Sequence, residues 1–360
     1  MKSIYRQARE RFLYLYVTNE CNLRCKHCYV GNDRLNKSEY FAPEKAREVM
    51  EYFKATYGHD KLYILGGEPT KHPQLDKIVD HALACDYSIT ISSNGDFDDD
   101  IFEKIPPHKL ASINFSLESS HHEIHTKIRG RKDNYDKVVQ NINKASEKGY
   151  QVRVMCTVSE TNVEQAFDLI PFLADMGVDT LSYHNLGLTG NAKEYLTPLT
   201  PEKWMNFCEE LETLPPDPRI SIYYPPTFIK DKDLSKYADR GYGGCPARTL
   251  DRPHVYPDGS VYLCPLLMDD ERYFAKFENG RLILNTDPSS ELNAYLKIDE
   301  ICIGCSQSKS CGGGCPAYSN MDAYQEEEWY TCDRKTIPLC ILWTTYAWEK
   351  APEKIIHEFR

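Results

Sequence analysis

The sequence has no long hydrophobic run. No stretch approaches the roughly 18 consecutive apolar residues of a membrane-spanning helix, which excludes a transmembrane segment. The first residues, MKSIYRQARERFLYLYVT, are charged and then alternate, so they lack the apolar core and small-residue cleavage site of a signal peptide. We therefore expect a cytoplasmic protein without a membrane partner.

Positive charge is also scarce. The 43 Lys and Arg residues against 54 Asp and Glu residues give a net charge of -11. Nucleic acids and anionic membrane surfaces repel an acidic protein, so neither is an expected partner. Internal repeats and low-complexity tracts are missing as well, which excludes a repeat architecture.

Strand-like and helix-like segments alternate up to about residue 215. The strand-like runs are Phe12–Val17, Leu62–Leu65, Tyr87–Ile91, Ile113–Leu117, Val152–Val158 and Thr180–Tyr183. The helix-like stretches lie near 43–57, 73–85, 134–148 and 162–176, with a weaker one near 98–104. This repetition predicts a parallel sheet with right-handed crossovers. Because six units are too few for an eight-fold barrel, we expect an α/β fold with a partial (β/α)6 barrel and an active site at the carboxyl ends of its strands.

Changes in composition predict four segments. Residues 1–214 are expected to form the partial barrel, and the proline-rich, charged residues 215–240 a linker with one short strand, Ile220–Tyr224. Residues 241–337 are rich in Gly and Cys and predict a second, metal-dependent domain. Residues 338–360 are expected to be a C-terminal helix.

Cysteine is abundant. Fourteen cysteines in a chain with no export signal are typical of metal ligands or catalytic thiols, because disulfides are rare in the cytosol. Cys85, Cys156 and Cys208 stand alone in apolar patterns and are expected to be buried, inert thiols.

The first cysteine group is CNLRCKHCY, directly after the first predicted strand. Three thiolates on one tight loop, from Cys21, Cys25 and Cys28, suit a soft polynuclear centre such as a [4Fe–4S] cube with one iron left open. A zinc site that takes a fourth ligand, for example His27, is the alternative from the residues alone.

The spacing C-x3-C-x2-C followed by Tyr29 resembles the signature of the radical S-adenosylmethionine (SAM) superfamily. In that superfamily the open iron is chelated by the amino and carboxylate groups of SAM. GGEP, which begins at Gly66, resembles the motif that binds the SAM amino group, here through Glu68. SSNG at 92–95 and SLES at 116–119 resemble the ribose and carboxylate contacts, although Glu118 stands where relatives often have Asp.

The resemblance implies further SAM contacts. Arg129 is expected at the SAM carboxylate, and Val158 and Asn162 near adenine and ribose. The full set of expected cofactor-binding residues is Tyr29, Gly66, Gly67, Glu68, Pro69, Ser93, Asn94, Ser116, Glu118, Arg129, Val158 and Asn162.

The second cysteine group lies in the C-terminal part of the chain. Its members are Cys245, Cys264, Cys302, Cys305, Cys311, Cys315 and Cys332, with Gly259 five positions before Cys264. The order and spacing, including CGGGCPA, resemble the seven-cysteine SPASM pattern, whose domains carry two auxiliary [4Fe–4S] clusters. The resemblance assigns Cys302, Cys305, Cys311 and Cys332 to an outer cluster and Cys245, Cys264 and Cys315 to an inner one. From the residues alone, a pair of zinc ribbons is the alternative.

The inner cluster is one ligand short. Some relatives have an extra cysteine just before the first, where this chain has Asp239, Arg240 and Gly241. Two alternatives stay open: an iron left free for a substrate group, or closure by Cys340.

The resemblance implies an oxidoreductase with three [4Fe–4S] clusters. It cleaves SAM reductively to a 5′-deoxyadenosyl radical and oxidatively modifies a C–H bond, in most relatives of this kind in a ribosomally synthesised peptide. The implied partners are a precursor peptide and a flavodoxin or ferredoxin reductant. A separate leader-peptide-binding protein is a further expectation, since only 20 residues precede Cys21.

Three other functions share features with this sequence. The first is a small-molecule substrate, such as a tetrapyrrole or an aminocyclitol, and the second a non-enzymatic iron–sulfur redox or storage protein. Sulfatase activation is disfavoured, because Pro265 replaces the Asp of those enzymes. Candidate substrate-facing residues are Tyr183 and His184 first, then His121, His122 and Tyr223–Tyr224.

Overall fold

A computed structural model describes residues 10–239, 244–268, 272–290, 302, 304–319, 336–340 and 345–350. Three residues discussed above, Arg240, Gly241 and Cys332, lie outside these described residues.

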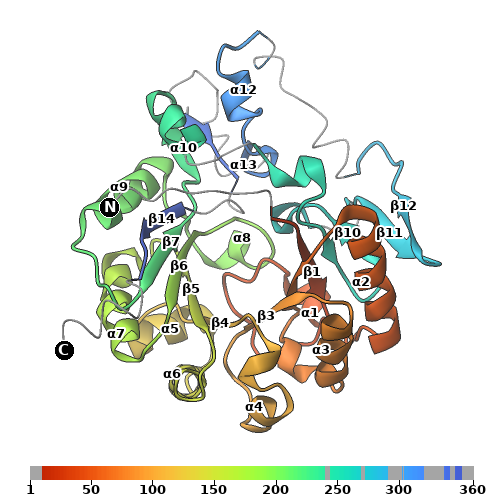
Figure 1. Cartoon of the computed structure of the whole chain (residues 1–360). Coiled ribbons are helices and arrows are strands. Elements are labelled where there is room, and N and C mark those ends of the chain that lie inside the picture. The colour runs from red at the N-terminus through yellow and green to blue at the C-terminus, as the bar shows by residue number, and fades with distance from the viewer. Residues whose placement is uncertain are drawn as a thin grey trace.

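One large mixed sheet dominates the described part of the chain (Figure 1). Twelve strands follow the order β12-β11-β10-β9-β1-β2-β3-β4-β5-β6-β7-β14, and β13 pairs with β8 in a separate two-stranded sheet. The strands are β1 (Phe12–Tyr16), β2 (Lys61–Leu65), β3 (Ser88–Ser93), β4 (Ser112–Ser116), β5 (Val152–Val158), β6 (Thr180–Asn185), β7 (Ser221–Tyr224), β8 (Phe228–Lys230), β9 (His254–Val255), β10 (Ser260–Tyr262), β11 (Ala275–Glu278), β12 (Arg281–Leu284), β13 (Thr336–Pro338) and β14 (Thr345–Trp348).

Strands β1 to β7 are successive in the chain and each is parallel to the next, so each connection between them is a crossover. The helices of the described residues are α1 (Asn32–Leu35), α2 (Pro43–Tyr57), α3 (Leu75–Ala84), α4 (Asp100–Lys104), α5 (His122–Arg129), α6 (Asn134–Glu147), α7 (Leu169–Asp175), α8 (Ala192–Tyr195), α9 (Pro201–Thr213), α10 (Leu234–Asp239), α12 (Ser308–Cys311) and α13 (Pro316–Ser319). Short 3-10 turns include η1 (Pro69–Lys71), η3 (Val163–Asp168), η5 (Pro246–Thr249) and η6 (Pro265–Leu267). This arrangement confirms the expected α/β fold with a parallel, partial-barrel sheet.

Helix α2 illustrates how the sequence produces these elements. Pro43 begins it at a first-turn position, and its buried stripe packs on the sheet through Ala46, Val49 and Phe53. Gly58 ends it in the left-handed region, at φ 71°, and its N–H donates to the Lys54 carbonyl.

The two faces of strand β1 pack against different clusters of side chains. Leu13 and Leu15 belong to the core under the helices, whereas Tyr16 joins Tyr256 and Tyr262 in a second, aromatic cluster on the opposite face. The barrel interior beside the first cysteine loop is therefore lined by tyrosines.

Two segments differ in part from the expectation. Within 215–240 the expected short strand is present as β7, which extends the main sheet beside β6, but β8 and α10 were not expected. Within 338–360, residues 345–348 form strand β14 and not a helix, because this Thr-Tyr-Ala-Trp run pairs antiparallel with β7. Trp348 reinforces the pairing, since its Nε1 donates to the Ile220 carbonyl at 3.0 Å.

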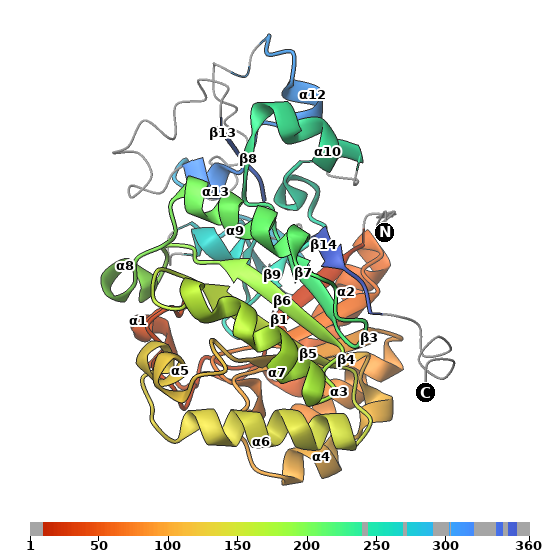
Figure 2. The same cartoon turned by 90° about the vertical axis from the view of Figure 1, so that its left-hand side faces the viewer.

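The carboxyl ends of the parallel strands lie along one edge of the sheet. The segments bearing α10, α12, α13, β8 and β13 gather at one end of the molecule in both views, away from α4 and α6 (Figures 1 and 2). In the part of the chain that the structure describes, no helix has the length and apolar character needed to cross a membrane.

Candidate active site

The loop that carries Cys21, Cys25 and Cys28 follows β1, and its main chain is held by hydrogen bonds to two distant segments. Lys26 N–H donates to the Ile128 carbonyl at 2.9 Å. Asn191, after β6, donates its N–H to the Cys28 carbonyl at 2.9 Å and its Nδ2 to the Cys25 carbonyl at 3.0 Å. The three thiols are thus held by loops far apart in the sequence.

The two glycines of GGEP lie against this loop. Gly67 N–H donates to the Thr18 carbonyl at 2.8 Å, and Glu68 N–H donates to the Glu20 carbonyl at 2.8 Å. A Cβ at Gly66 would lie 2.7 Å from the Thr18 carbonyl oxygen, and one at Gly67 would lie 2.4 Å from that of Glu20. Both positions need glycine because the chain itself passes so close.

The Glu68 carboxylate is fully buried and accepts four hydrogen bonds. Its Oε1 accepts from Thr70 N at 3.1 Å, Thr70 Oγ1 at 2.7 Å and Ser93 Oγ at 2.8 Å. Its Oε2 accepts from Asn94 N at 2.7 Å and so keeps acceptor capacity. Burial raises the pKa of Glu68, and these donors oppose that rise.

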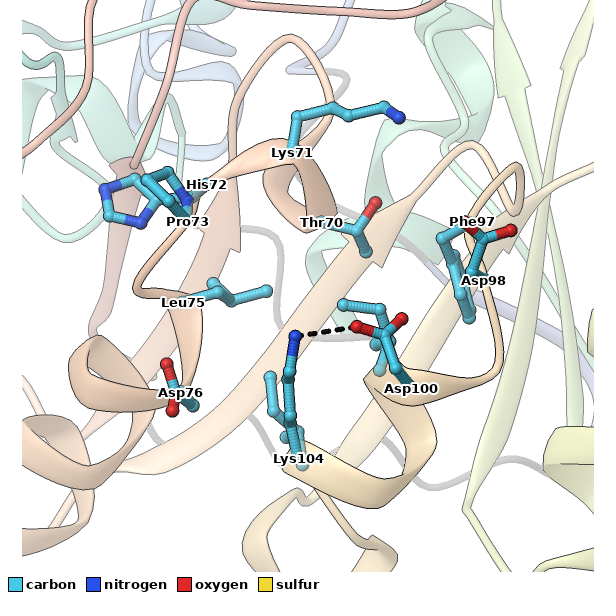
Figure 3. A pocket seen from close by; sticks show the side chains of 12 residues that line it. Thr70, Lys71, His72, Pro73, Leu75, Asp76, Phe97, Asp98, Asp100 and Lys104 are labelled. Atoms are coloured by element: carbon cyan, nitrogen blue, oxygen red, sulfur yellow. Dashed lines mark hydrogen bonds and ion pairs between the residues drawn. The ribbon is translucent and has the colours of Figure 1, made fainter.

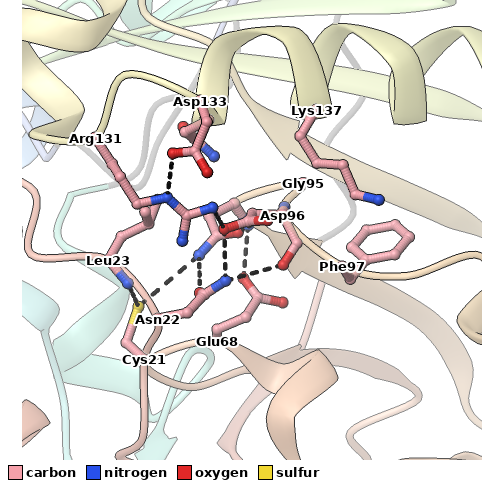
Figure 4. Close-up of polar contacts among 12 residues, drawn as sticks. Cys21, Asn22, Leu23, Glu68, Gly95, Asp96, Phe97, Arg131, Asp133 and Lys137 are labelled. Atoms are coloured by element: carbon pink, nitrogen blue, oxygen red, sulfur yellow. Dashed lines mark hydrogen bonds and ion pairs between the residues drawn. The ribbon is translucent and has the colours of Figure 1, made fainter.

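A polar network continues from Glu68 to the surface (Figure 4). Asn94 Nδ2 donates to Asn22 Oδ1 at 2.8 Å, and Asn22 Nδ2 donates to Asp96 Oδ2 at 2.8 Å. Arg131 pairs with the same Asp96 carboxylate at 2.5 Å. The sequence prediction included Asn94 but missed Asn22, which ties the cysteine loop to the end of β3.

On the other side of the loop, Glu118 and Arg129 form a buried ion pair. Arg129 Nη2 donates to Glu118 Oε1 at 2.5 Å, and its Nη1 donates to Cys25 Sγ at 3.5 Å. Glu118 Oε2 accepts from Thr157 N at 2.7 Å. The Arg129 guanidinium lowers the pKa of Glu118 against the opposing effect of burial. Arg129, expected at a SAM carboxylate, is therefore already engaged by Glu118 and Cys25.

Two histidines flank this pair in their neutral form. His27 Nε2 lies 3.5 Å from Glu118 Oε1, while burial lowers the pKa of His27 to about 4. His125 Nδ1 accepts from Glu118 N at 3.2 Å, so its Nε2 carries the proton and donates to Asn134 Oδ1 at 2.8 Å. Burial lowers the pKa of His125 to about 4 as well.

Burial also raises the pKa of each of the three thiols of this loop. It raises the pKa of Cys21 to about 12 and that of Cys28 to about 11, and it raises the pKa of Cys25 against the opposing charge of Arg129. Within the described residues, no three His, Cys, Asp or Glu side chains are close enough together to hold a single metal ion. A zinc ion binds each thiolate at about 2.3 Å and so brings its ligands into contact, whereas an iron–sulfur cube spaces its thiolates more widely.

The remaining predicted SAM contacts lie along the same edge. Asn162 follows β5, and its Nδ2 donates to the Glu118 carbonyl at 2.9 Å and to the Thr157 carbonyl at 3.0 Å. Val158 is buried at the end of β5, Pro69 begins η1, and Ser116 Oγ lies 3.5 Å from the Ser93 carbonyl. Tyr29 lies 2.8 Å, hydroxyl to hydroxyl, from Tyr16. The structure thus brings the predicted set together at one end of the sheet.

Most of the candidate substrate-facing residues are either buried in the core or exposed on the outside. The expectation for Tyr183 is wrong, because its side chain packs under η3 and its hydroxyl donates to the Ala166 carbonyl at 2.8 Å. His121 and His122 are on the outside, where His121 Nε2 lies 2.8 Å from Asp168 Oδ2 and His122 Nε2 lies 3.0 Å from the Lys132 carbonyl.

Tyr224 is also buried, with its hydroxyl donating to the Glu212 carboxylate, and Tyr223 packs on Tyr346 with ring centroids 4.0 Å apart. His184 alternates with Tyr183 along β6 and so faces the interior, where the charge of Glu118 reaches it. Burial lowers the pKa of His184 to about 4. It is the one residue of this group that stays a candidate.

Three of the C-terminal cysteines lie in the same kind of Cys-Pro turn. Cys245, Cys264 and Cys315 are each followed by proline at the start of a short helix, η5, η6 and α13 respectively. Leu266 N–H donates to Cys264 Sγ at 3.4 Å, and backbone N–H groups also donate to the thiols of Cys245 and Cys315. Cys302, Cys305 and Cys311 lie on the neighbouring turn and on α12, where Cys305 N–H donates to the Cys302 carbonyl at 3.3 Å.

A pocket of about 200 Å³ lies away from the cysteines, between η1, α3 and α4 (Figure 3). Its lining includes Lys71, Asp98 and an ion pair between Lys104 Nζ and Asp100 Oδ2 at 2.6 Å. These are solvated surface side chains, and the pocket meets the site at Thr70, which lines it and donates to Glu68.

Known proteins resemble this chain in sequence. Residues 15–173 match the family model of the radical SAM superfamily. The antilisterial bacteriocin subtilosin biosynthesis protein AlbA of Bacillus subtilis (strain 168) is 28% identical over 193 residues, which are 51% of this chain and 41% of that protein. The GTP 3',8-cyclase of Aquifex aeolicus (strain VF5) is 26% identical over 263 residues, 71% of this chain and 81% of that protein. The chain thus spans less than half the length of AlbA.

Solved structures share the fold. Streptococcus suis SuiB bound to S-adenosylmethionine has a TM-score of 0.67 at 16% identity, over 89% of this chain and 75% of that one. Native anSMEcpe with bound AdoMet has a TM-score of 0.61 at 19% identity, over 84% of this chain and 89% of that one. With the cysteine loop at the carboxyl edge of a parallel sheet, the family match confirms the resemblance over the part of the chain that it covers: residues 15–173 match the radical SAM superfamily.

Proposed function

We propose that this chain is a radical SAM enzyme that uses SAM as cosubstrate and oxidatively modifies a peptide. The observation that carries the proposal is the loop of Cys21, Cys25 and Cys28, placed at the strand ends between the buried carboxylate of Glu68 and the pair of Glu118 with Arg129. Three thiols with no fourth on the loop fit a [4Fe–4S] cluster that leaves one iron for SAM. When bound, that cluster supplies the electron that cleaves SAM to methionine and a 5′-deoxyadenosyl radical.

The side chains around the loop have separate tasks in this proposal. Glu68 Oε2, with one acceptor site left, binds the SAM ammonium group. Arg129 neutralises Glu118 and orients Cys25, and it offsets the negative charge of a thiolate cluster. The donors Thr70, Ser93 and Asn94 hold the Glu68 carboxylate in place before SAM arrives.

The direct test is reductive cleavage of SAM. The chain, loaded with iron and sulfide without oxygen, is mixed with SAM and dithionite, and 5′-deoxyadenosine is measured. We expect product from the wild type and from Cys208→Ala, whose buried thiol lies outside the site, and none from Cys25→Ala. An iron-loaded wild type that makes no more product than Cys25→Ala would overturn the proposal.

Two relatives support a peptide substrate. AlbA is named for the biosynthesis of a bacteriocin, and SuiB was solved bound to the precursor peptide SuiA, with a TM-score of 0.68 over 89% of this chain.

A small-molecule substrate is the second candidate. The GTP 3',8-cyclase covers 71% of this chain, more than AlbA does, and the Fe-coproporphyrin III synthase of Methanosarcina barkeri (strain Fusaro / DSM 804) is 24% identical over 179 residues. Both names point to substrates far smaller than a peptide.

Transfer of deuterium separates the two candidates. The loaded enzyme is given SAM, dithionite and extracts of deuterium-grown cells, divided by size into a small-molecule and a peptide fraction. The substrate delivers one deuterium atom to 5′-deoxyadenosine, which gains one mass unit. We expect the gain with the peptide fraction; a gain confined to the small-molecule fraction refutes the peptide assignment.

A further inference from the structure

Four buried thiols from distant parts of the chain converge in the C-terminal half. Cys245, Cys264, Cys315 and Cys340 are 6%, 3%, 2% and 2% exposed. A side-chain hydrogen bond joins Cys340 to Cys245, and Cys340 also lies within electrostatic reach of Cys315 and Cys264. Cys340 therefore contacts Cys245 and lies near the other two thiols.

Main-chain hydrogen bonds attach the two residues before Cys340 to two other segments of the chain. Cys340 follows β13, whose Pro338 carbonyl accepts from Cys315 N–H at 2.9 Å. The next residue, Leu339, donates its N–H to the Thr227 carbonyl at 2.7 Å beside β8. The strand that precedes Cys340 is thus attached directly to the turn of Cys315.

The turn of Cys245 is attached to the same region. The preceding Gly244 lies so close to Gly312 that a Cβ on Gly312 would lie 3.0 Å from the Gly244 Cα. Arg248, in the turn after Cys245, donates to the Gly312 carbonyl. These contacts hold the cysteine turns together without any contribution from a metal.

The thiol chemistry differs within the group. The first three cysteines accept backbone N–H groups at Cys-Pro turns, which suits thiolate ligands of an iron–sulfur cluster. Cys340 comes from a strand end with no proline after it.

We propose that Cys340 is the fourth ligand of the inner auxiliary cluster, which therefore has no iron open to substrate. Beyond the proposed function, the inference rests on the SPASM resemblance, which implies that this half of the chain binds iron–sulfur clusters. A cube with four thiolates exchanges electrons but has no vacant coordination site. The inner cluster then accepts an electron from the oxidised substrate, and it does not bind the substrate.

The test uses the full chain with the first cluster removed by Cys21→Ala, Cys25→Ala and Cys28→Ala together. On this background, Cys340→Ala is compared with Cys208→Ala, a buried cysteine outside the four. Each protein is loaded with iron and sulfide, reduced, and examined by electron paramagnetic resonance with and without cyanide, a small ligand for an open iron. We expect cyanide to shift the spectrum of Cys340→Ala beyond any shift in Cys208→Ala; equal responses overturn the proposal.

Alkylation tests the same point in the chain without the Cys340 substitution, which covers the case that Cys340→Ala does not fold. Iodoacetamide is applied before and after iron chelation, and modified cysteines are identified by mass spectrometry. We expect Cys340 to react at least tenfold faster after chelation, whereas equal rates, or a disulfide between Cys245 and Cys340 in the loaded protein, refute the assignment. Because this background cannot cleave SAM, the outcome is independent of the 5′-deoxyadenosine assay.

Discussion

Arg129 has the most demanding environment of any single residue near the first cysteine loop. It is 6% exposed, it pairs with a carboxylate that is 1% exposed, and its Nε is buried without a hydrogen-bond partner among the described residues. Charges buried this deeply are stable only as a pair, so each depends on the other.

Replacement of Arg129 alone is therefore expected to lower the free energy of unfolding. Arg129→Met leaves Glu118 as an unpaired buried charge, and we expect a loss of about 3–5 kcal/mol in the free energy of unfolding. The measurement is urea unfolding, with Arg131→Met as the matched control. Arg131 is about one-third exposed in its pair with Asp96, so its replacement should cost less than about 1 kcal/mol.

A double variant completes this test. Glu118→Gln in the Arg129→Met background removes the stranded charge and should recover part of the loss. Similar losses from Arg129→Met and Arg131→Met would contradict the buried-pair description.

At the scale of elements, the site depends on two loops in direct contact. The GGEP turn and the loop before Cys21 approach so closely that Gly67 has no room for a side chain. The conformation of the cysteine loop therefore depends on the turn at the end of β2.

Gly67→Ala tests this coupling. The new Cβ would lie 2.4 Å from the Glu20 carbonyl oxygen, so one loop has to move, at an expected cost of about 1–3 kcal/mol in stability. We expect the variant to lose the iron of the first cluster, measured as iron per chain and as the SAM-dependent change in its electron paramagnetic resonance spectrum. Gly149→Ala is the control: a Cβ there meets nothing within 4 Å, while its left-handed φ of 81° gives the substitution a strain cost of its own outside the GGEP turn. Equal iron contents in the two variants would argue against the coupling.

The sequence predicts elements whose own residues carry the signal. The strand Val152–Val158 and the helix 43–57 agree with β5 and α2 to the residue. Strand β14 was missed because it has four residues and gains its identity from pairing with β7, more than 100 positions earlier. Local pattern carries no information about such a partner.

The same distinction applies to the site. The cysteine spacing and GGEP are local patterns, and their residues meet at the strand ends. Asn191 and His125 were missed, because neither an Asn before a short helix nor a His on a helix has a pattern that reveals which distant carbonyl or N–H it will meet. Arg129 was predicted as a site residue, but its partners became clear only from the fold.

At the scale of the whole molecule, buried neutral histidines couple the fold to pH. Burial lowers the pKa of six histidines in the described residues: His27, His59, His72, His125, His184 and His254. His254 is the extreme case, with a pKa of about 3, and it lies far along the chain from the others. Each such residue binds a proton in the unfolded chain at a pH where the folded chain keeps it neutral.

The sign of the effect follows from this difference. Below the unfolded pKa of about 6.5 the unfolded state holds more protons, so stability falls as pH falls, until the folded pKa is reached. Above about pH 6.5 the contribution is complete. Because the six residues act in the same direction, we expect stability to fall steeply between about pH 6.5 and pH 4.

His254→Phe isolates one member of this group. The phenyl ring can keep the stacking on Tyr14, whose ring centroid lies 4.4 Å from that of His254, while the titration disappears. The free energy of unfolding, measured in urea from pH 7 to pH 5, should fall less steeply than in the wild type, by up to about 1.4 kcal/mol per pH unit. His108→Phe, at an exposed position, should keep the wild-type slope. A wild-type slope in His254→Phe would mean that the acid sensitivity of the molecule arises at other groups.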